Sequence, residues 1–81
     1  MKRVITFGTF DLFHIGHLNI LKRAKEQGDY LIVGVSSDEL NKKKGKMSII
    51  SLNERIDIVK SIKYVDEVFI EDSLELKDQY I

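Results

Sequence analysis

The chain has 81 residues, 43% of them hydrophobic, and its 13 Lys and Arg residues balance 13 Asp and Glu residues. This length fits one compact domain, and the zero net charge excludes a global field that would draw the chain to nucleic acid. Because no cysteine is present, neither a disulfide nor a cysteine metal cluster is expected, and a reducing cytoplasm is the natural setting. The N-terminal apolar stretch breaks at Gly8 and Asp11, too early for a signal peptide or a membrane-spanning helix.

The first half of the chain predicts a strand, a helix and a second strand. Residues 3–8 form a short β-branched and apolar run, which suits a strand buried on both faces of a parallel sheet. From about 16 to 27 the apolar residues recur near the helical period, and Gly28 supplies a left-handed stop. Residues 30–36 form an apolar, β-rich run that is typical of a second strand.

The second half continues this alternation after a polar, lysine-rich segment that we expect to be a loop. Ser51 and Glu54 have the spacing of a capping box, so a second helix is predicted to start near Leu52. Residues 64–70 predict a third strand, and residues 73–81 predict the beginning of another helix. The order calls for a parallel sheet with right-handed crossovers. We therefore expect one Rossmann-like, three-layer α/β/α domain over residues 1–81 that stops after the third strand.

Two histidines follow the first predicted strand. In open α/β sheets, ligands bind beyond the carboxyl ends of the strands, and a helix N-terminus there favours phosphate. His14 and His17 lie about one helical turn apart, so both rings can face one anion, and Gly16 lets the backbone approach the ligand. For an isolated pair of this spacing, helix capping or a plain surface position stays the competing interpretation. Zinc is disfavoured because it needs three or four ligands, and the chain has 2 His and no Cys.

The sequence around these histidines resembles a known family. Residues 8–17 read GTFDLFHIGH, which resembles GTFDxxHxGH, the signature of the cytidylyltransferases within the HxGH nucleotidyltransferase superfamily. Further segments are similar to bacterial glycerol-3-phosphate cytidylyltransferases at the same spacing. These segments are residues 28–31, 36–41, 54–55 and 64–68, so the resemblance covers essentially the whole chain.

The resemblance implies transfer of CMP from CTP to a phosphorylated small alcohol, with release of pyrophosphate, assistance by magnesium and no covalent intermediate. Glycerol 3-phosphate is the expected alcohol phosphate, with a choline-phosphate-like compound as the alternative. The catalytic residues would be His14 and His17, which stabilise charge on the phosphoryl oxygens. The nucleotide-binding positions implied by the signature are Thr9, Phe10, His14, Ile15, Gly16 and His17. Of these, Phe10 can equally be an ordinary core residue that binds no ligand.

Basic residues outside the signature extend the expected site. The resemblance assigns Lys46 to the CTP phosphates, and Lys44 and Lys77 to the phosphate of the second substrate. A lysine run is usually a solvated loop, but this one leaves the carboxyl end of the second strand, on the same edge as the histidines. Lys63 stands where the family often has Arg. A lysine at this position would lack the bidentate phosphate recognition that an arginine offers.

Asp11 and Arg55 are expected to support the site. Asp11 is predicted either to orient a lysine or a loop amide or simply to form a turn. Arg55 matches a family position, where a guanidinium can bind carboxylate or phosphate in bidentate fashion. A structural ion pair between Arg55 and an acid such as Asp66 is equally compatible with the sequence.

Two later parts of the family pattern do not occur in this chain, namely a fourth strand with a GDDW-like segment and an RTxGIST-like motif. We therefore expect a C-terminally incomplete domain that lacks part of its nucleotide site. In the expected strand order 3-2-1-4-5, residues 4–7 would have an unpaired edge that invites another chain. The sequence is thus expected to be a fragment of a longer protein or to be completed by a partner, and a homodimer is the expected assembly.

Two alternative functions stay open beside the cytidylyltransferase. One is an adenylyltransferase of the same superfamily, of the heptose-phosphate or flavin-forming type. The other is a non-catalytic chain that binds nucleotide or forms dimers. In the leading interpretation the partners are CTP and a phosphorylated small molecule, with neither nucleic acid nor membrane among them.

Overall fold

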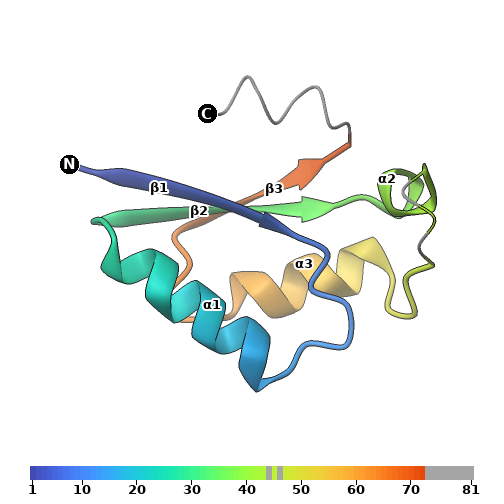
Figure 1. Cartoon of the computed structure of the whole chain (residues 1–81), viewed down its shortest axis with the longest axis horizontal. Helices are drawn as coiled ribbons and strands as arrows, with labels where there is room; N and C mark the ends of the chain where they lie inside the picture. The colour runs from blue at the N-terminus through green and yellow to red at the C-terminus, as the bar shows by residue number, and fades with distance from the viewer. Residues whose placement is uncertain (44, 46, 73–81) are drawn as a thin grey trace.

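The computed structural model describes residues 1–43, 45 and 47–72, which form a three-stranded parallel sheet with helices packed against it (Figure 1). The strand order is β1-β2-β3, which matches the expected 3-2-1 half of a Rossmann-like sheet and leaves β1 at an edge of the described sheet. In chain order the elements are β1 (Arg3–Gly8), α1 (Ile15–Glu26), β2 (Tyr30–Ser36), α2 (Asp38–Lys43), α3 (Leu52–Lys60) and β3 (Glu67–Glu71).

The largest departure from the sequence-based prediction is α2, which occupies part of the segment expected to be a loop. Two acidic residues stand in its first turn and two lysines in its last, so both ends complement the helix dipole. The Ser37 hydroxyl accepts a hydrogen bond from the Leu40 amide at 3.0 Å, which caps the helix. A short helix without a wide apolar face gives almost no periodic signal.

The third strand starts at Glu67, later than the predicted Tyr64. The Asp66 amide donates to Leu31 O at 3.0 Å, and the Val65 amide donates to Ile62 O at 3.0 Å within a turn. Tyr64 and Val65 instead pack against the core. Their apolar character therefore reflects burial rather than strand pairing. The helix predicted at 73–81 lies outside the described residues.

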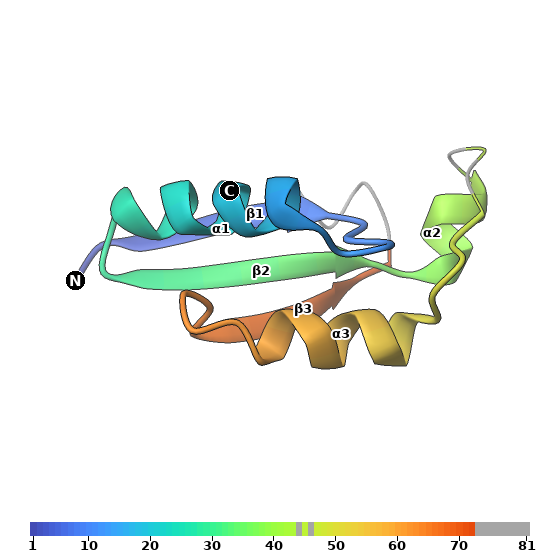
Figure 2. The ribbon, with the colours of Figure 1, turned by 90° about the horizontal axis from the view of Figure 1, so that it is seen from below.

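Both α1 and α3 cover the same face of the sheet. Leu21 of α1 and Val59 of α3 are fully buried in one cluster with Leu31, Val33 and Val35 of β2. Figure 1 shows both helices on one side of the sheet, and Figure 2 shows α1 running along β1 and α3 along β3. The described residues thus supply two of the three expected layers.

The opposite face of the sheet carries an aromatic pair over a glycine. Phe7 and Phe69 are the register neighbours of Gly34 on β1 and β3, and their rings meet edge to face at 5.8 Å between centroids. A Cβ added at Gly34 would lie 2.7 Å from Phe69 Cζ and 2.8 Å from Phe7 Cδ1. Gly34 therefore leaves the room that both rings require.

The substitution Gly34→Ala is expected to lower the free energy of unfolding by roughly 1–3 kcal/mol, because the added methyl group overpacks the two rings. Urea denaturation measures this loss. The same substitution in a Phe69→Leu background should cost clearly less, since the nearest ring is gone. An equal loss in both backgrounds would contradict the steric explanation.

The topology brings the connecting segments of the fold to one edge of the sheet. The loop after β1, the start of α2 after β2 and the N-terminus of α1 all lie at the carboxyl end of the parallel strands (Figure 1), where ligands bind in α/β folds. Among residues 1–43, 45 and 47–72, no helix combines the length and the apolar character required to cross a bilayer.

Candidate functional site

The loop between β1 and α1 has an unusual backbone. Phe10 and Leu12 adopt positive φ angles of 53° and 50°, a conformation that costs a non-glycine residue of order 1–3 kcal/mol. Phe10 is only 5% exposed and belongs to the hydrophobic core, which confirms the core interpretation of its side chain. The buried ring helps to fix a strained loop at the carboxyl end of β1.

The two histidines form a reciprocal cap at the start of α1. His14 is the N-cap residue, and its Nδ1 accepts a hydrogen bond from the Gly16 amide at 3.0 Å. His17 Nδ1 accepts one from the His14 amide at 3.2 Å. The rings lie 4.1 Å apart between centroids and are tilted by 35°. Capping and a paired arrangement of the rings, which the sequence offered as competing interpretations, therefore occur together.

These hydrogen bonds determine which ring nitrogens carry protons. Each Nδ1 acts as an acceptor, so the neutral form of each ring carries its hydrogen on Nε2. Burial lowers the pKa of His17 below its ordinary value of 6.5, and the neighbouring His14 lowers it further, whereas Asp11 acts in the opposite direction. His17 is thus a neutral N–H donor at neutral pH.

Gly16 also leaves room for a neighbouring side chain. A Cβ at this position would lie 2.7 Å from His14 Cε1, so the His14 ring packs closely against this glycine, and the approach of a ligand to its backbone stays a prediction. The amide of Gly16 is bonded to His14 Nδ1, and those of His17 and Leu18 donate to His14 O at 3.0 and 3.2 Å. Because these three backbone amides are already bonded to His14, the donors available to an anion at this helix end are the imidazole Nε2–H groups.

Aromatic neighbours hold the His17 ring in place. Its centroid lies 5.6 Å from that of Phe10 and 5.3 Å from that of Phe13. A ring confined in this way loses little entropy when it binds a ligand. Ile15, in contrast, is 68% exposed at the first position of α1.

A hollow of about 310 Å³ lies against the end of β1, an edge strand of the described sheet, and the start of α1. It is larger than two other hollows of about 180 and 240 Å³. Four of its lining residues were predicted to belong to the site, and Gly8 begins the signature. Phe7 and Ile20 were not predicted, since each is an ordinary apolar residue in its element. The lining residues are Phe7, Gly8, Thr9, Phe10, Asp11, His17 and Ile20.

Asp11 ties this loop to the segment before α3. Its two carboxylate oxygens accept hydrogen bonds from the amides of Ile49 and Ile50, each at 2.8 Å. These bonds, followed by the more distant Arg55 charge, hold the pKa of Asp11 below its ordinary value, against a smaller opposing effect of burial. The structure bears out the loop-amide interpretation of Asp11, and the residue also lies in a turn, as the alternative predicted.

Arg55 is fully buried, and its partner differs from the predicted one. Its Nη2 donates to Asp38 Oδ1 at 2.6 Å, whereas Asp66 accepts from Lys25 Nζ at 2.5 Å and from the Leu31 amide at 2.7 Å. The predicted structural ion pair is therefore confirmed, but its acid is Asp38 and the suggested Asp66 is wrong. Asp38 lies on α2, the helix that the periodicity did not predict, so its proximity to Arg55 was not foreseeable from the pattern.

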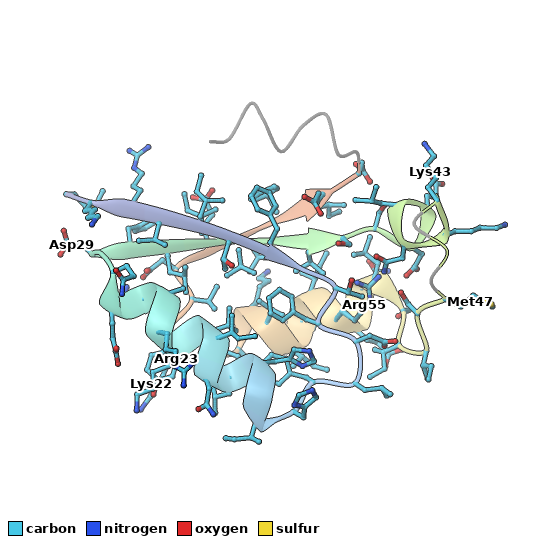
Figure 3. All side chains as sticks on the ribbon, in the orientation of Figure 1. Lys22, Arg23, Asp29, Lys43, Met47 and Arg55 are labelled. Atoms are coloured by element: carbon cyan, nitrogen blue, oxygen red, sulfur yellow. The ribbon has the colours of Figure 1, made fainter. Side chains whose placement is uncertain are left out.

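The remaining donors of Arg55 bind main-chain carbonyls. Nη1 donates to Thr9 O at 2.8 Å and to Ser36 O at 2.7 Å, and Nε donates to Ile50 O at 3.0 Å. Figure 3 shows Arg55 where the loops at the carboxyl ends of β1 and β2 meet, between α2 and α3. The Arg55 side chain is 0% exposed, and its bonds are to protein groups. It therefore supports the loops of the site from the interior and is not accessible to a ligand in solvent.

Other predicted residues have plainer positions. Thr9 donates its hydroxyl hydrogen to Asn41 Oδ1 at 3.3 Å. Lys44, Lys46 and Lys77, which were assigned to phosphate groups, lie outside the described residues, so their roles stay predictions. Lys63 is exposed and lies over the Tyr64 ring at 5.2 Å.

The sequence-based reasoning missed Asp38 and Asn41 as parts of the site. Both lie in the segment 36–41, which was noted only for its family resemblance. The acidic pair at its start followed by lysines is the charge pattern of a helix. That signal, read together with the resemblance, would have placed both side chains on a helix at the carboxyl end of β2.

The comparison with protein families decides what this arrangement is. The profile of the family described as "Cytidylyltransferase-like" matches residues 5–81. The chain belongs to this family. The predicted relationship, drawn from residues 8–17 and the four further segments, is thereby confirmed.

Individual relatives agree with this assignment. The chain is 52% identical over 81 residues to the glycerol-3-phosphate cytidylyltransferase of Bacillus subtilis (strain 168), covering 100% of this chain and 63% of that protein. It is 48% identical over 69 residues to the FAD synthase of Thermococcus sibiricus (strain DSM 12597 / MM 739), covering 84% of this chain and 47% of that protein. The chain thus spans about half to just under two thirds of the length of these relatives.

A solved structure supports the fold. The crystal structure of the lipopolysaccharide core biosynthesis protein from Thermoplasma volcanium GSS1 matches with a TM-score of 0.90 and 33% sequence identity. The match covers 98% of this chain and 65% of that chain. The Rossmann-like arrangement of the family is therefore present in the described part of this chain.

The lowered pKa of His17 can be measured directly. In an NMR titration, the His17 ring resonances should have a midpoint below 6.5 in the folded chain and near the ordinary value in the urea-unfolded chain. Because the folded state then binds fewer protons, stability should fall as the pH drops through this range. A folded-state midpoint at or above 6.5 would contradict the buried, neutral assignment.

The bonds to Asp11 predict a different pH dependence. Because its folded pKa lies below 3.8, the stability that Asp11 contributes is fully present above that value and is lost as the pH falls through the folded pKa. The variant Asp11→Asn should therefore be less stable than the unaltered chain near neutrality, and the gap should close in acid. Urea unfolding at several pH values measures this gap. Asp66, whose pKa is also lowered, is present in both proteins, so its effect cancels, and a gap independent of pH would refute the assignment.

Proposed function

We propose that the chain carries the nucleotide-binding loop of a cytidylyltransferase, which transfers CMP from CTP to a phosphorylated small alcohol and releases pyrophosphate. The observation that carries this proposal is the His14–His17 pair, whose Nδ1 atoms cap α1 and whose Nε2–H groups remain as donors. Identity of 52% to a glycerol-3-phosphate cytidylyltransferase supports glycerol 3-phosphate as the alcohol phosphate.

In this reaction an oxygen of the alcohol phosphate attacks the α-phosphorus of CTP in line. A new phosphorus–oxygen bond forms, and the bond to the pyrophosphate oxygen breaks. Negative charge grows on the oxygens around the α-phosphorus, so catalysis depends on alignment and on fixed hydrogen-bond donors. His14 and His17 are proposed to be these donors. Both are oriented by the backbone before any ligand arrives.

Magnesium is proposed to enter with the triphosphate. In the described part of the chain, no three His, Cys, Asp or Glu side chains converge on a metal position, and both oxygens of Asp11 accept main-chain bonds. These residues therefore fit a cation held mainly by phosphate oxygens and water rather than by a cage of protein ligands, as is usual for magnesium. Bound in this way, magnesium would neutralise charge on the phosphates.

An adenylyltransferase is the second candidate, because the chain is 48% identical to an FAD synthase over 69 residues. Calorimetric titration with MgCTP and MgATP separates the two. CTP is expected to bind more tightly, and an ATP preference above about tenfold, roughly 1.4 kcal/mol, would favour the adenylyl alternative.

A cytoplasmic homodimer is part of the proposal. The absence of cysteine suits a reducing compartment. β1 lies at an edge of the described sheet, a position that favours pairing with a further strand.

The variant His17→Asn tests the catalytic role. The asparagine oxygen can still accept the bond from the His14 amide, so the cap is retained while the Nε2–H donor is lost. Pyrophosphate release from MgCTP and glycerol 3-phosphate should fall about a hundred- to a thousandfold. The control Lys22→Ala changes an exposed residue of the same helix that points away from the site (Figure 3) and should keep the full rate.

Three results would speak against this function. If His17→Asn turns over within tenfold of the unaltered chain, a difference of about 1.4 kcal/mol in activation free energy, His17 is not a catalytic donor. CTP binding without pyrophosphate release by the unaltered chain would favour the non-catalytic hypothesis. Failure of CTP to bind at all would remove the nucleotide site itself.

A further inference from the structure

Asn41 has a fully buried side-chain amide, and both ends of that amide form hydrogen bonds. The residue lies on α2 with 0% exposure. Its Oδ1 accepts the hydroxyl hydrogen of Thr9 at 3.3 Å, and its Nδ2 donates to the hydroxyl oxygen of Ser48 at 2.6 Å. The amide therefore lies between two hydroxyl groups that come from different segments.

The two hydroxyl groups belong to different hollows at the carboxyl edge of the sheet. Thr9 lines the hollow of about 310 Å³ beside His17. Ser48 lines the hollow of about 240 Å³ together with Asp38, Lys42 and Met47. Asn41 connects the linings of both hollows through a single side chain.

We propose that Asn41 is a positioning residue, which couples the Thr9 hydroxyl at the nucleotide hollow to the Ser48 hydroxyl in the segment before α3. A carboxamide has a donor end and an acceptor end. With Oδ1 toward Thr9, the Thr9 hydrogen is committed to Asn41, and the oxygen lone pairs are what Thr9 offers elsewhere. The Asn41 Nδ2 donates to Ser48, so both ends of the amide are engaged in this arrangement. This inference rests on the proposed function in one respect, namely that the hollow beside His17 takes the nucleotide.

Other contacts already join the same segments without using hydroxyl groups. Asp11 binds the amides of Ile49 and Ile50, and Arg55 binds Thr9 O and Ile50 O. These bonds fix the backbone. Burying an amide is costly unless both of its ends are bonded, and what Asn41 adds is a buried hydrogen-bonded link between two side-chain hydroxyl groups.

A double-mutant cycle tests this coupling. Thr9→Val and Ser48→Ala are made singly and together, and the free energy of unfolding is measured in urea. Because both hydroxyl groups bind one amide, the two effects should be non-additive. In an Asn41→Leu background the same two substitutions should become additive. If Asn41→Leu does not fold, the cycle in the unaltered background still decides the question.

Calorimetric titration with MgCTP separates positioning from a merely structural role. Ser48→Ala lies outside the lining of the nucleotide hollow, yet it should weaken MgCTP binding about two- to tenfold by freeing the amide that orients Thr9. The matched control is Ser61→Ala, which removes an exposed hydroxyl bonded to Ile58 O at the end of α3 and should leave MgCTP affinity unchanged.

The outcomes are distinct from those of the proposed function. Additive unfolding effects overturn the coupling whether or not CTP binds. Non-additive unfolding with unchanged MgCTP affinity in Ser48→Ala overturns the positioning role. If MgCTP fails to bind the unaltered chain, the proposed function and the positioning of nucleotide both fail, while the unfolding cycle still decides whether the two hydroxyl groups are coupled.

Discussion

One buried cation organises the carboxyl edge of this sheet. The Arg55 guanidinium bonds to the last carbonyl of β2, to the carbonyl after β1 and to the segment before α3. Its charge is balanced by Asp38, whose side chain is 55% exposed. Solvent screens the attraction to the half-exposed Asp38, whereas loss of the buried guanidinium would leave three main-chain carbonyls without their donor. Together with the bonds from Asp11 to the amides of Ile49 and Ile50, this side chain fixes the mutual placement of the loops that make up the site.

The His14–His17 pair lies at the end of one of the loops that Arg55 holds in place, and it supplies the hydrogen-bond donors of the proposed site. The Nδ1 atoms cap the helix, while the Nε2–H groups are left for a ligand. The same two rings therefore stabilise α1 and supply the donors. Since backbone amides of the first turn are bonded to His14, anion binding at this helix relies on side chains more than on the bare helix end. Aromatic packing around His17 keeps that donor in one orientation.

Much of the fold followed from local sequence signals. The strands at residues 3–8 and 30–36 and the Ser51 cap were predicted because each rests on neighbouring residues alone. The spacing of His14 and His17 likewise predicted paired rings. What the pattern could not supply were contacts between distant segments, such as Arg55 with Asp38. The short helix α2 carries too few apolar residues for a periodic signal, and its absence from the prediction concealed Asn41 as well.

The position of the main hollow links assembly to ligand binding. Phe7 and Gly8, which line it, belong to β1, the edge strand of the described sheet. A strand added to this edge, from this protein or from another copy, would become a second wall of the hollow. Nucleotide affinity and strand addition would then be thermodynamically reciprocal: any factor by which the added strand tightens nucleotide binding is the factor by which nucleotide tightens the strand. Bound nucleotide would in that way stabilise the strand pairing that completes its own binding site.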